Sequence, residues 1–186
     1  MFLRFFCAVV CLIMLSACSP DYNWRQVQVA DGRVTALFPS KPQTQQKKLD
    51  FGGRELLFSL TGATVDDTVF AMGYTIHSGD FKTDAALRDQ LYRQVVSSFY
   101  HNAGQTPPES LPGSGQWFSV RVAGSGNAKP VVLQAVVWNE SDALIEALVS
   151  GPESSFPQDQ AAEFFKGTGL PVQYPAQVSK GPDDLR

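Results

Sequence analysis

Apolar and polar residues alternate in short runs between residues 24 and 76, and this period of two limits the fold more than any other feature of the chain. The alternation is clear in residues 24–29 and again in 34–38, with Asp31-Gly32 between them. Alternation places the apolar side chains on one face of a strand, and Asp-Gly between two such runs indicates a β-hairpin. The next segments extend the pattern to a second hairpin and a fifth strand: 45–51 and 54–63 around Gly52-Gly53, then 70–76.

The pattern then changes to the period of a helix. Apolar residues recur every four positions at Leu87, Leu91, Val95 and Phe99. This spacing predicts one long helix over about residues 84–102, with Thr83 or Asp84 as its cap and Gly104 after its end. Two acid-before-base pairs at i,i+4 would add about 0.2–0.5 kcal/mol each: Asp84/Arg88 and Asp89/Arg93.

The last third returns to strands and ends in a short helix. Strands are predicted at about 116–123, 130–138 and 143–149, and the 131–138 run is apolar on both faces, as in a central strand covered on both sides. The stretch "PQDQAAEFFKG" predicts a short helix with Phe164 and Phe165 inward. Strands grouped in runs with few helices predict an α+β domain with a largely antiparallel sheet, on which the long helix and the short C-terminal helix pack. We expect a single domain at 24–172 and a tail at 173–186, and the pattern leaves open whether the strands form one sheet or two.

The first residues have the features of an export signal. One basic residue, Arg4, precedes a run from Phe5 to Ala17 in which every residue except Ser16 is apolar. That length fits the apolar region of a secretory signal peptide, whereas a membrane-spanning helix needs about 20 apolar residues. A membrane span is therefore the weaker interpretation.

The end of this run, Leu15-Ser16-Ala17-Cys18, resembles the lipobox of bacterial lipoproteins. The resemblance implies cleavage after residue 17, lipid attachment to Cys18, and a tether over residues 18–23. Cys7 and Cys11 would leave with the signal peptide, so Cys18 would be the only remaining cysteine. In such lipoproteins an Asp directly after the cysteine tends to retain the protein in the inner membrane. This chain has Ser19 there, which favours the periplasmic face of the outer membrane. The alternative is an ordinary signal peptide with an incidental Cys18.

Composition argues against several classes of partner. The chain carries 15 basic and 18 acidic side chains, a net charge of −3, and its longest basic cluster is Lys47-Lys48. These charges disfavour nucleic acid and electrostatic adhesion to anionic lipid. A hydrophobic content of 44% is ample for a packed core, so the chain is expected to fold.

The order of elements also resembles a known sandwich fold. An early hairpin ending in "FPSKP", strands ending in "MGYTI", one long helix, a strand hairpin and a terminal "FF" helix are similar to the PsbP subunits of photosystem II and to a Ran-binding nuclear-import factor. The resemblance covers about residues 24–172. It implies an α/β/α sandwich that acts as a binding or assembly module, and it assigns no functional residue.

One aromatic and one basic residue are the candidate partner-binding pair. Along "QWFSVRV", Trp117, Ser119 and Arg121 point to one face of the strand and the apolar residues to the other. Trp117 and Arg121 on one semi-polar face could bind a protein partner. The alternative is that a helix packs over Trp117.

The sequence offers only weak candidates for catalytic or metal-binding residues. The two histidines, His77 and His101, lack the spacing of a metal site, and we expect His77 at a strand end on the surface and His101 at a helix C-terminus. Ser114 and Ser125 lack the Gly that a nucleophile elbow has two positions before its serine, since Pro112 and Ala123 stand there. The acidic residues of the predicted turns are read as solvated side chains, and Glu146 is read as an edge-strand residue that would need a partner if it were buried. These acidic positions are Asp66, Asp67, Glu140, Asp142 and Glu146.

The sequence therefore predicts a non-enzymatic, lipid-anchored protein of the cell envelope that binds a protein partner or assists assembly close to the membrane. A carrier of a small apolar ligand is the second hypothesis, and an envelope enzyme is the third. No cofactor, metal or nucleic acid is expected.

Overall fold

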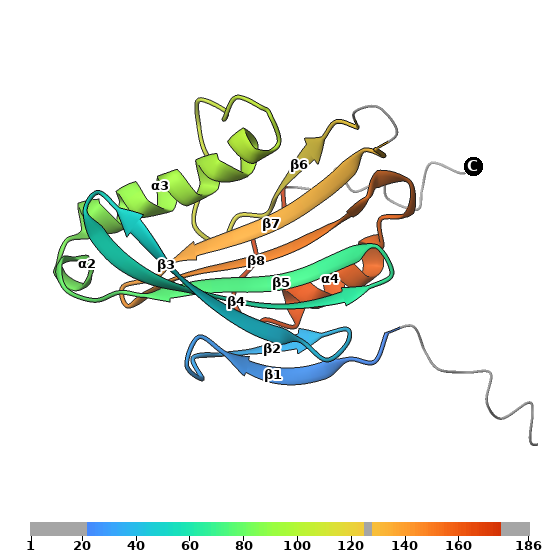
Figure 1. Cartoon of the computed structure of the whole chain (residues 1–186), viewed down its shortest axis with the longest axis horizontal. Coiled ribbons are helices and arrows are strands. Elements are labelled where there is room, and N and C mark those ends of the chain that lie inside the picture. Colours follow the sequence, from blue (N-terminus) through green and yellow to red (C-terminus); the bar gives the residue numbers. More distant parts are fainter. Residues whose placement is uncertain (1–21, 125–127, 176–186) are drawn as a thin grey trace, which may run out of the picture.

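The computed structural model describes residues 22–124 and 128–175. A six-stranded antiparallel sheet of order β3-β4-β5-β8-β7-β6 lies beside a separate two-stranded sheet of β1 and β2 (Figure 1). The strands are β1 (Arg25–Val29), β2 (Val34–Phe38), β3 (Gln43–Phe51), β4 (Arg54–Val65), β5 (Thr68–Ile76), β6 (Phe118–Val122), β7 (Val131–Asn139) and β8 (Ala143–Pro152). The helical segments are α2 (Asp80–Thr83), α3 (Ala85–Asn102), η1 (Glu153–Ser155) and α4 (Gln158–Lys166). The predicted α+β class and antiparallel pairing are confirmed, and the strands form two sheets.

Both predicted hairpins form, and their turns explain why. β3 and β4 are joined by Gly52 (φ 58°) and Gly53 (φ 78°), and a two-residue turn with both φ values positive matches the twist of the strands it connects. The β1–β2 turn also has positive φ angles, at Ala30, Asp31 and Gly32. Glycine and aspartate adopt this region more readily than most residues, so the turn chemistry and the alternation specify the same hairpins.

Helix α3 begins where the sequence predicts. The Asp84 side chain accepts a hydrogen bond of 3.0 Å from the backbone N of Leu87, which caps the helix. The ion pair between Asp89 and Arg93 forms at 2.8 Å. The predicted Asp84–Arg88 pair does not, because Asp84 serves as the cap and Arg88 donates to the carbonyl of Phe81 at 2.8 Å.

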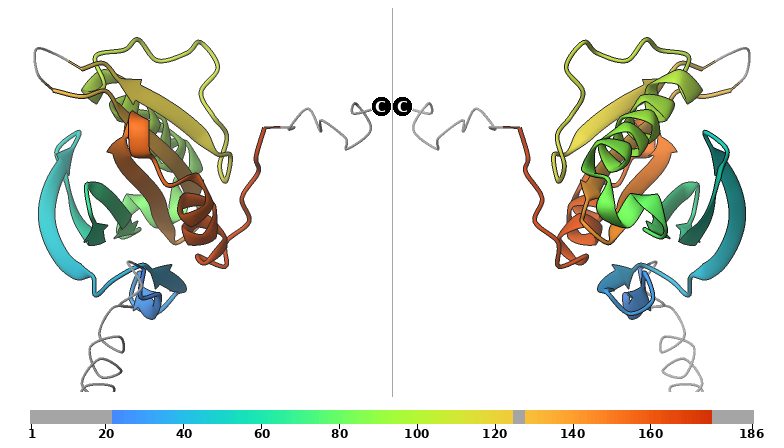
Figure 2. Two further views of the ribbon diagram at one scale, coloured as in Figure 1. Left: turned by 90° about the vertical axis from the view of Figure 1, so that its right-hand side faces the viewer. Right: turned by 90° about the vertical axis from the view of Figure 1, so that its left-hand side faces the viewer.

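Helices cover both faces of the main sheet. Helix α3 packs over one face, and α4 together with the β1–β2 hairpin packs over the other (Figures 1 and 2). On the α4 side, Phe164 lies edge-on to Phe38 and Phe70, with ring centroids 5.5 and 5.6 Å apart. On the α3 side, Phe118 is edge-on to Phe99 at 5.5 Å. The sheet is therefore the middle layer between two separate apolar clusters.

Strand β7 shows how this layering is encoded. Val136 and Trp138 belong to the cluster under α4, whereas Ala135 and Val137 belong to the cluster under α3. Both sets are buried, which confirms the prediction that the apolar run 131–138 is covered on both faces.

Residues just outside the expected 24–172 domain also make contacts. At the start, the backbone N of Asn23 donates to the carbonyl of Pro39 at 2.7 Å. At the end, Gln173 forms a parallel bridge with Gln116. No helix in the described ranges combines the length and apolarity needed to cross a membrane.

Candidate functional site

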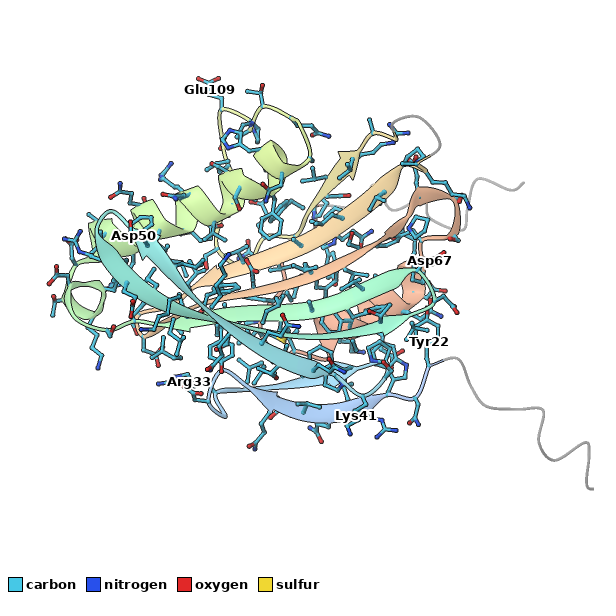
Figure 3. All side chains as sticks on the ribbon, in the orientation of Figure 1. Tyr22, Arg33, Lys41, Asp50, Asp67 and Glu109 are labelled. Carbon is cyan, nitrogen blue, oxygen red and sulfur yellow. The ribbon has the colours of Figure 1, made fainter. Side chains whose placement is uncertain are left out.

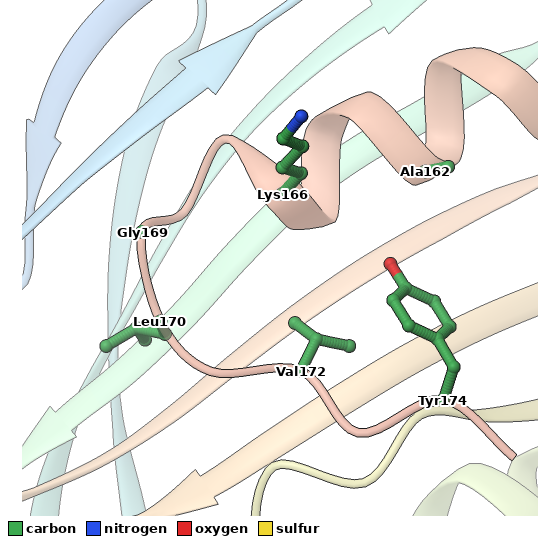
Figure 4. A pocket seen from close by; sticks show the side chains of 6 residues that line it. All are labelled: Ala162, Lys166, Gly169, Leu170, Val172 and Tyr174. Carbon is green, nitrogen blue, oxygen red and sulfur yellow. The ribbon is translucent and has the colours of Figure 1, made fainter. Parts of the chain in front are cut away.

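An open groove lies between helix α4 and the extended segment 169–175 that follows it (Figure 4). It encloses about 680 Å³. Its side chains come from both walls: Ala162 and Lys166 from α4, and Leu170, Val172 and Tyr174 from the segment. Tyr174 is 46% exposed, an unusual amount for a large aromatic side chain next to a packed core. We call this feature the α4 groove.

Backbone hydrogen bonds hold the second wall of the α4 groove in place. Gln173 donates to the carbonyl of Gly115 at 2.8 Å and accepts from the backbone N of Trp117 at 2.9 Å. The indole Nε1 of Trp138, which is almost fully buried, donates to the carbonyl of Pro171 at 2.8 Å. The segment is thus fixed to the sheet by three hydrogen bonds, so the groove does not depend on a loose chain end.

The groove continues along the edge of the sheet to Trp117. The Trp117 and Tyr174 rings lie 6.3 Å apart, and this second part of the groove encloses about 490 Å³. The amide of Gln134 donates to the side chain of Gln158 at 2.8 Å among its lining residues. Trp117 is half-buried and lies beside α4, so it is both partly covered by a helix and part of the groove wall.

Arg121, the predicted companion of Trp117, does not line the groove. Its guanidinium forms two hydrogen bonds with the Glu153 carboxylate, at 2.8 and 2.9 Å. This pairing raises the pKa of Arg121 and lowers that of Glu153, and both side chains are exposed. Trp117 therefore lines the groove, whereas Arg121 is engaged in an exposed ion pair with Glu153.

The charge in the part of the α4 groove between α4 and residues 169–174 comes from one residue. Lys166 is exposed there and takes part in none of the ion pairs of the described chain. The other lining side chains of that part are apolar or uncharged. A ligand that fits must be largely apolar and can place an acidic group near the Lys166 ammonium.

Glu146 is the most perturbed titratable group, and the expectation of an edge-strand position for it is wrong. Strand β8 lies between β5 and β7, so Glu146 points to the α3 face of a central strand and is only 7% exposed. No hydrogen bond or ion pair to its carboxyl is found in the described part of the chain. Burial away from water raises the pKa of Glu146 to about 7.

A glycine makes room for this carboxyl. Glu146 is opposite Gly73 in β5. A Cβ atom on Gly73 would come within 2.5 Å of both the Glu146 Oε1 and the tip of the Phe58 ring. The carboxyl and the ring therefore share the space that a side chain at position 73 would need.

His77 is also buried, so the expectation of a surface position is wrong. Its ring stacks on Phe81 of α2 with centroids 5.9 Å apart, and its Nδ1 is 3.4 Å from the carbonyl of Ser141. Its Nε2 has no partner in the described structure. Burial lowers the pKa of His77, which favours the neutral form of the ring. His101 lies exposed in the last turn of α3, as expected.

The remaining candidates are engaged in other contacts or are exposed in turns, apart from one that the structure does not describe. The Ser114 hydroxyl accepts from the backbone N of Asn139 at 2.8 Å, and Ser125 lies outside the described residues. Asp142 pairs with Arg33 at 3.0 Å, and this hydrogen bond lowers its pKa.

The acidic turn residues are exposed, at Asp66 and Asp67 between β4 and β5 and at Glu140 before β8. Across residues 22–124 and 128–175, no three His, Cys, Asp or Glu side chains are grouped as metal ligands.

The sequence contains one local signal for the α4 groove. Leu170, Val172 and Tyr174 alternate in "LPVQYP", which begins two residues after the "FFKG" end of α4. Alternation of this kind indicates an extended segment with one apolar face, although part of it falls in the region expected to be a polar tail.

Cys18 and the other residues of the lipobox lie outside the described residues. The lipobox and the similarity to the PsbP-like sandwich therefore stay predictions. The chain matches no protein-family model, no curated protein and no solved structure.

Proposed function

We propose that the protein is a non-catalytic, lipid-anchored module of the bacterial cell envelope that binds an apolar segment of a partner protein in the α4 groove. Anchoring would occur through Cys18, with the periplasmic face of the outer membrane as the favoured location. The observation that carries the binding role is the open groove itself, with exposed Tyr174 on one wall and α4 on the other.

The chemistry of the groove supports a protein segment as the ligand. Large aromatic side chains such as Tyr174 and Trp117 are typical of the residues that contribute most to binding at interfaces. The groove is open along its length, which suits a chain that enters and leaves it. Lys166 favours a segment with an acidic residue next to its apolar ones.

The non-catalytic part of the proposal is supported by the contacts in which the reactive side chains are engaged. Ser114 is hydrogen-bonded in a loop, His77 is buried against Phe81, and Asp142 is paired with Arg33. A nucleophile, a base and an orienting group would have to lie within hydrogen-bond reach of one another. His77 and Asp142 are neighbours, since the backbone N of His77 donates to the carbonyl of Asp142 at 2.8 Å. Their side chains contact the Ser141 carbonyl and Arg33 instead of each other.

The test places a photo-crosslinking amino acid at Tyr174 in living cells, with a second one at Gln94 on the exposed face of α3 as the control position. We expect a discrete protein adduct from position 174 and not from position 94. Ala162→Arg should abolish it, because Ala162 is exposed and lines the groove. Ala86→Arg makes the same substitution at an exposed site on α3 and should leave the adduct unchanged. Adducts that persist in Ala162→Arg would contradict the proposal.

The anchoring role has a separate test. Cys18→Ser should abolish metabolic labelling with palmitate and move the protein from the membrane to the soluble fraction, since anchoring would rest on the acyl chains of that residue. Unchanged labelling or fractionation in the variant would show that Cys18 is not the lipid site.

A small amphiphile is the second candidate ligand. The 680 Å³ of the groove is within the range of about 300–1,000 Å³ that is typical of small-molecule sites, and an acidic head group could pair with Lys166. In the crosslinking experiment this ligand would appear as a mass increase of the monomer of a few hundred daltons at position 174, without a protein adduct.

A further inference from the structure

Strand β4 exposes apolar side chains and buries polar ones. On the face that it shares with Ala63 of the α4 cluster, Ser59 and Thr61 are buried. On its other face, Leu60 is exposed and Phe58 is only half-buried. A sheet with one solvated face normally shows the reverse, with apolar side chains inward and polar ones toward water. The outer face of β4 therefore has the composition of a surface that is covered by something else.

The exposed apolar residues of the two neighbouring strands lie on the same face. Leu49 of β3 is opposite Leu56, which belongs to the cluster under α3, and Val69 of β5 is opposite Thr64. Alternate residues of β4 from 56 to 64 share this face, because strand side chains alternate. Three side chains on it are between 38% and 40% exposed, an unusual amount for large apolar residues: Leu49, Leu60 and Val69. Together with Phe58 we call them the β3–β5 patch.

Helix α3 leaves this half of the face open. The cluster that it covers includes Phe118 of β6, Val137 of β7 and Leu144 of β8, and Figure 2 shows the helix over that side of the sheet. Six strands at a spacing of about 4.8 Å extend about 24 Å from β3 to β6, whereas a helix with its side chains is about 10–12 Å wide. The width that α3 does not cover is therefore that of about one further helix.

The length of the patch also fits a helix. Asp50, which follows Leu49, and Asp67, two residues before Val69, lie toward opposite ends of the molecule (Figure 3). From residue 56 to residue 64, β4 extends about 26 Å, the length of a helix of about 17 residues. Since α3 rises about 10–12 Å above the same face, it holds a flat surface, such as a bilayer or a second sheet, away from the patch.

Lys47 supplies the unpaired charge beside the patch. It is exposed, lies opposite Phe58 on the same face, and takes part in none of the ion pairs of the described chain. The charges of α3 are engaged elsewhere, because Asp89 and Arg93 pair with each other next to residues 111–114 and Arg88 donates to the carbonyl of Phe81. Charges at the two ends of the patch are of both signs and set no preference: Arg54 with Asp80 at the α2 end, and Lys41, Asp66 and Asp67 at the other. Lys47 therefore favours an acidic residue on the side of the occupant that lies over β3.

A second copy of the chain does not have the required surface. The outer faces of its helices α3 and α4 carry polar and charged side chains, such as Gln90, Gln94, Asp159 and Glu163. Neither helix could place an apolar stripe on the β3–β5 patch.

We propose that the β3–β5 patch binds an amphipathic helix of a partner protein, with the apolar stripe of the helix on Leu49, Leu60 and Val69 and an acidic residue over Lys47. The bound helix would complete the layer that α3 begins. This site lies on the face of the sheet opposite α4 and does not depend on the α4 groove.

The test places a photo-crosslinking amino acid at Val69 of the full-length protein in living cells. We expect an adduct with a partner protein. Leu60→Asp should abolish it, whereas Leu57→Asp, the same change at an exposed leucine on the other face of β4, should leave it unchanged. Thermal unfolding of both variants checks that the fold is retained. Ala162→Arg, which blocks the α4 groove, should also leave this adduct unchanged.

The conformation and the charge are measured on the partner segment. Mass spectrometry of the adduct identifies the segment joined to position 69, which is then synthesised as a peptide. We expect its circular dichroism to become helical when it binds the purified protein. Lys47→Glu should weaken binding about fivefold, because an exposed attraction is modest but its reversal adds repulsion. Lys48→Glu changes the neighbouring residue on the other face and should leave binding unchanged. A peptide with lysine in place of its acidic residue should regain binding to Lys47→Glu.

Several results would overturn the proposal. These are the lack of any adduct at position 69, an adduct that persists in Leu60→Asp, and an adduct with the mass of a second copy of the chain or of one phospholipid. A peptide that binds without becoming helical, or equally well to Lys47→Glu, would also overturn it. Loss of the adduct in Ala162→Arg would show that positions 69 and 174 report one site, against the proposal. An adduct at position 69 with none at position 174 would support the helix site and refute the α4 groove.

Discussion

The buried carboxyl of Glu146 gives the sharpest prediction about stability. Glu146→Gln keeps the shape of the side chain but is neutral at every pH. At about pH 4.5 the free energies of unfolding of the variant and the wild type should differ only by a constant offset. At pH 8 the variant should be the more stable protein. The offset does not change with pH, because the Gln side chain does not titrate.

The size of the effect follows from the pKa of Glu146. It is about 7 in the folded protein against an ordinary value of 4.5, and each pH unit of difference corresponds to about 1.4 kcal/mol. Between these two values the unfolded chain has released its proton while the folded protein still holds it. Since the unfolded chain binds fewer protons in this window, the free energy of unfolding falls as the pH rises. Above about pH 7 the loss is complete, at about 3 kcal/mol.

Urea unfolding at pH 4.5, 6 and 8 measures this difference. Trp138 is almost fully buried and serves as a fluorescent reporter. The gap between Glu146→Gln and the wild type should widen by about 3 kcal/mol from pH 4.5 to 8, and the shared pH dependence of other groups cancels in the comparison. Glu109→Gln makes the same change at an exposed loop position and should show no widening. If the curves of Glu146→Gln and the wild type stay parallel across this range, the reasoning about burial is wrong.

Three other substitutions test the packing and the helix cap. Phe164→Ala should lower the free energy of unfolding by about 3–5 kcal/mol, because a fully buried ring is lost; thermal unfolding would show it, and a loss below 1 kcal/mol would contradict the packing. Gly73→Ala should cost about 1–3 kcal/mol by overpacking against Glu146 and Phe58. That loss should be smaller in a Glu146→Ala background, and a double-mutant cycle with no coupling would argue against the contact. Asp84→Ala should cost about 1 kcal/mol through the lost cap of α3, whereas Asp84→Ser should retain most of the stability in urea unfolding.

The local parts of the fold could be predicted from the sequence. The Gly52-Gly53 turn and the α3 cap at Asp84 depend on residues within a few positions of one another, so their chemistry is visible in a short window. Strand order could not be predicted in this way, because β5 pairs with β8 across about seventy residues. Alternation indicates which residues share a face of a strand, but not which strands are neighbours in the sheet.

The expectations for His77 and Glu146 are wrong because the sequence pattern does not reveal which elements pack against each other. A polar residue in an alternating strand is normally solvated on one face, but β8 is central and covered on both faces. His77 is buried because the short helix α2 brings Phe81 over it, and a helix of four residues leaves no detectable period in the sequence. Tyr174 belongs to the α4 groove through hydrogen bonds of its neighbour Gln173 to residues almost sixty positions earlier, which no local pattern can show.

The pairing of β5 with β8 also decides how the chain reaches its native state. The first five strands form by local hairpins, yet the Phe164 ring that packs on both Phe38 and Phe70 belongs to α4 near the end of the chain. Folding rates fall as contacts become more distant in sequence, so this domain should fold slowly. An N-terminal fragment that stops before β8 would expose both phenylalanines and the unpaired edge of β5. Such a fragment should aggregate, and a chaperone that holds the nascent chain would have to release it only after α4 has been made.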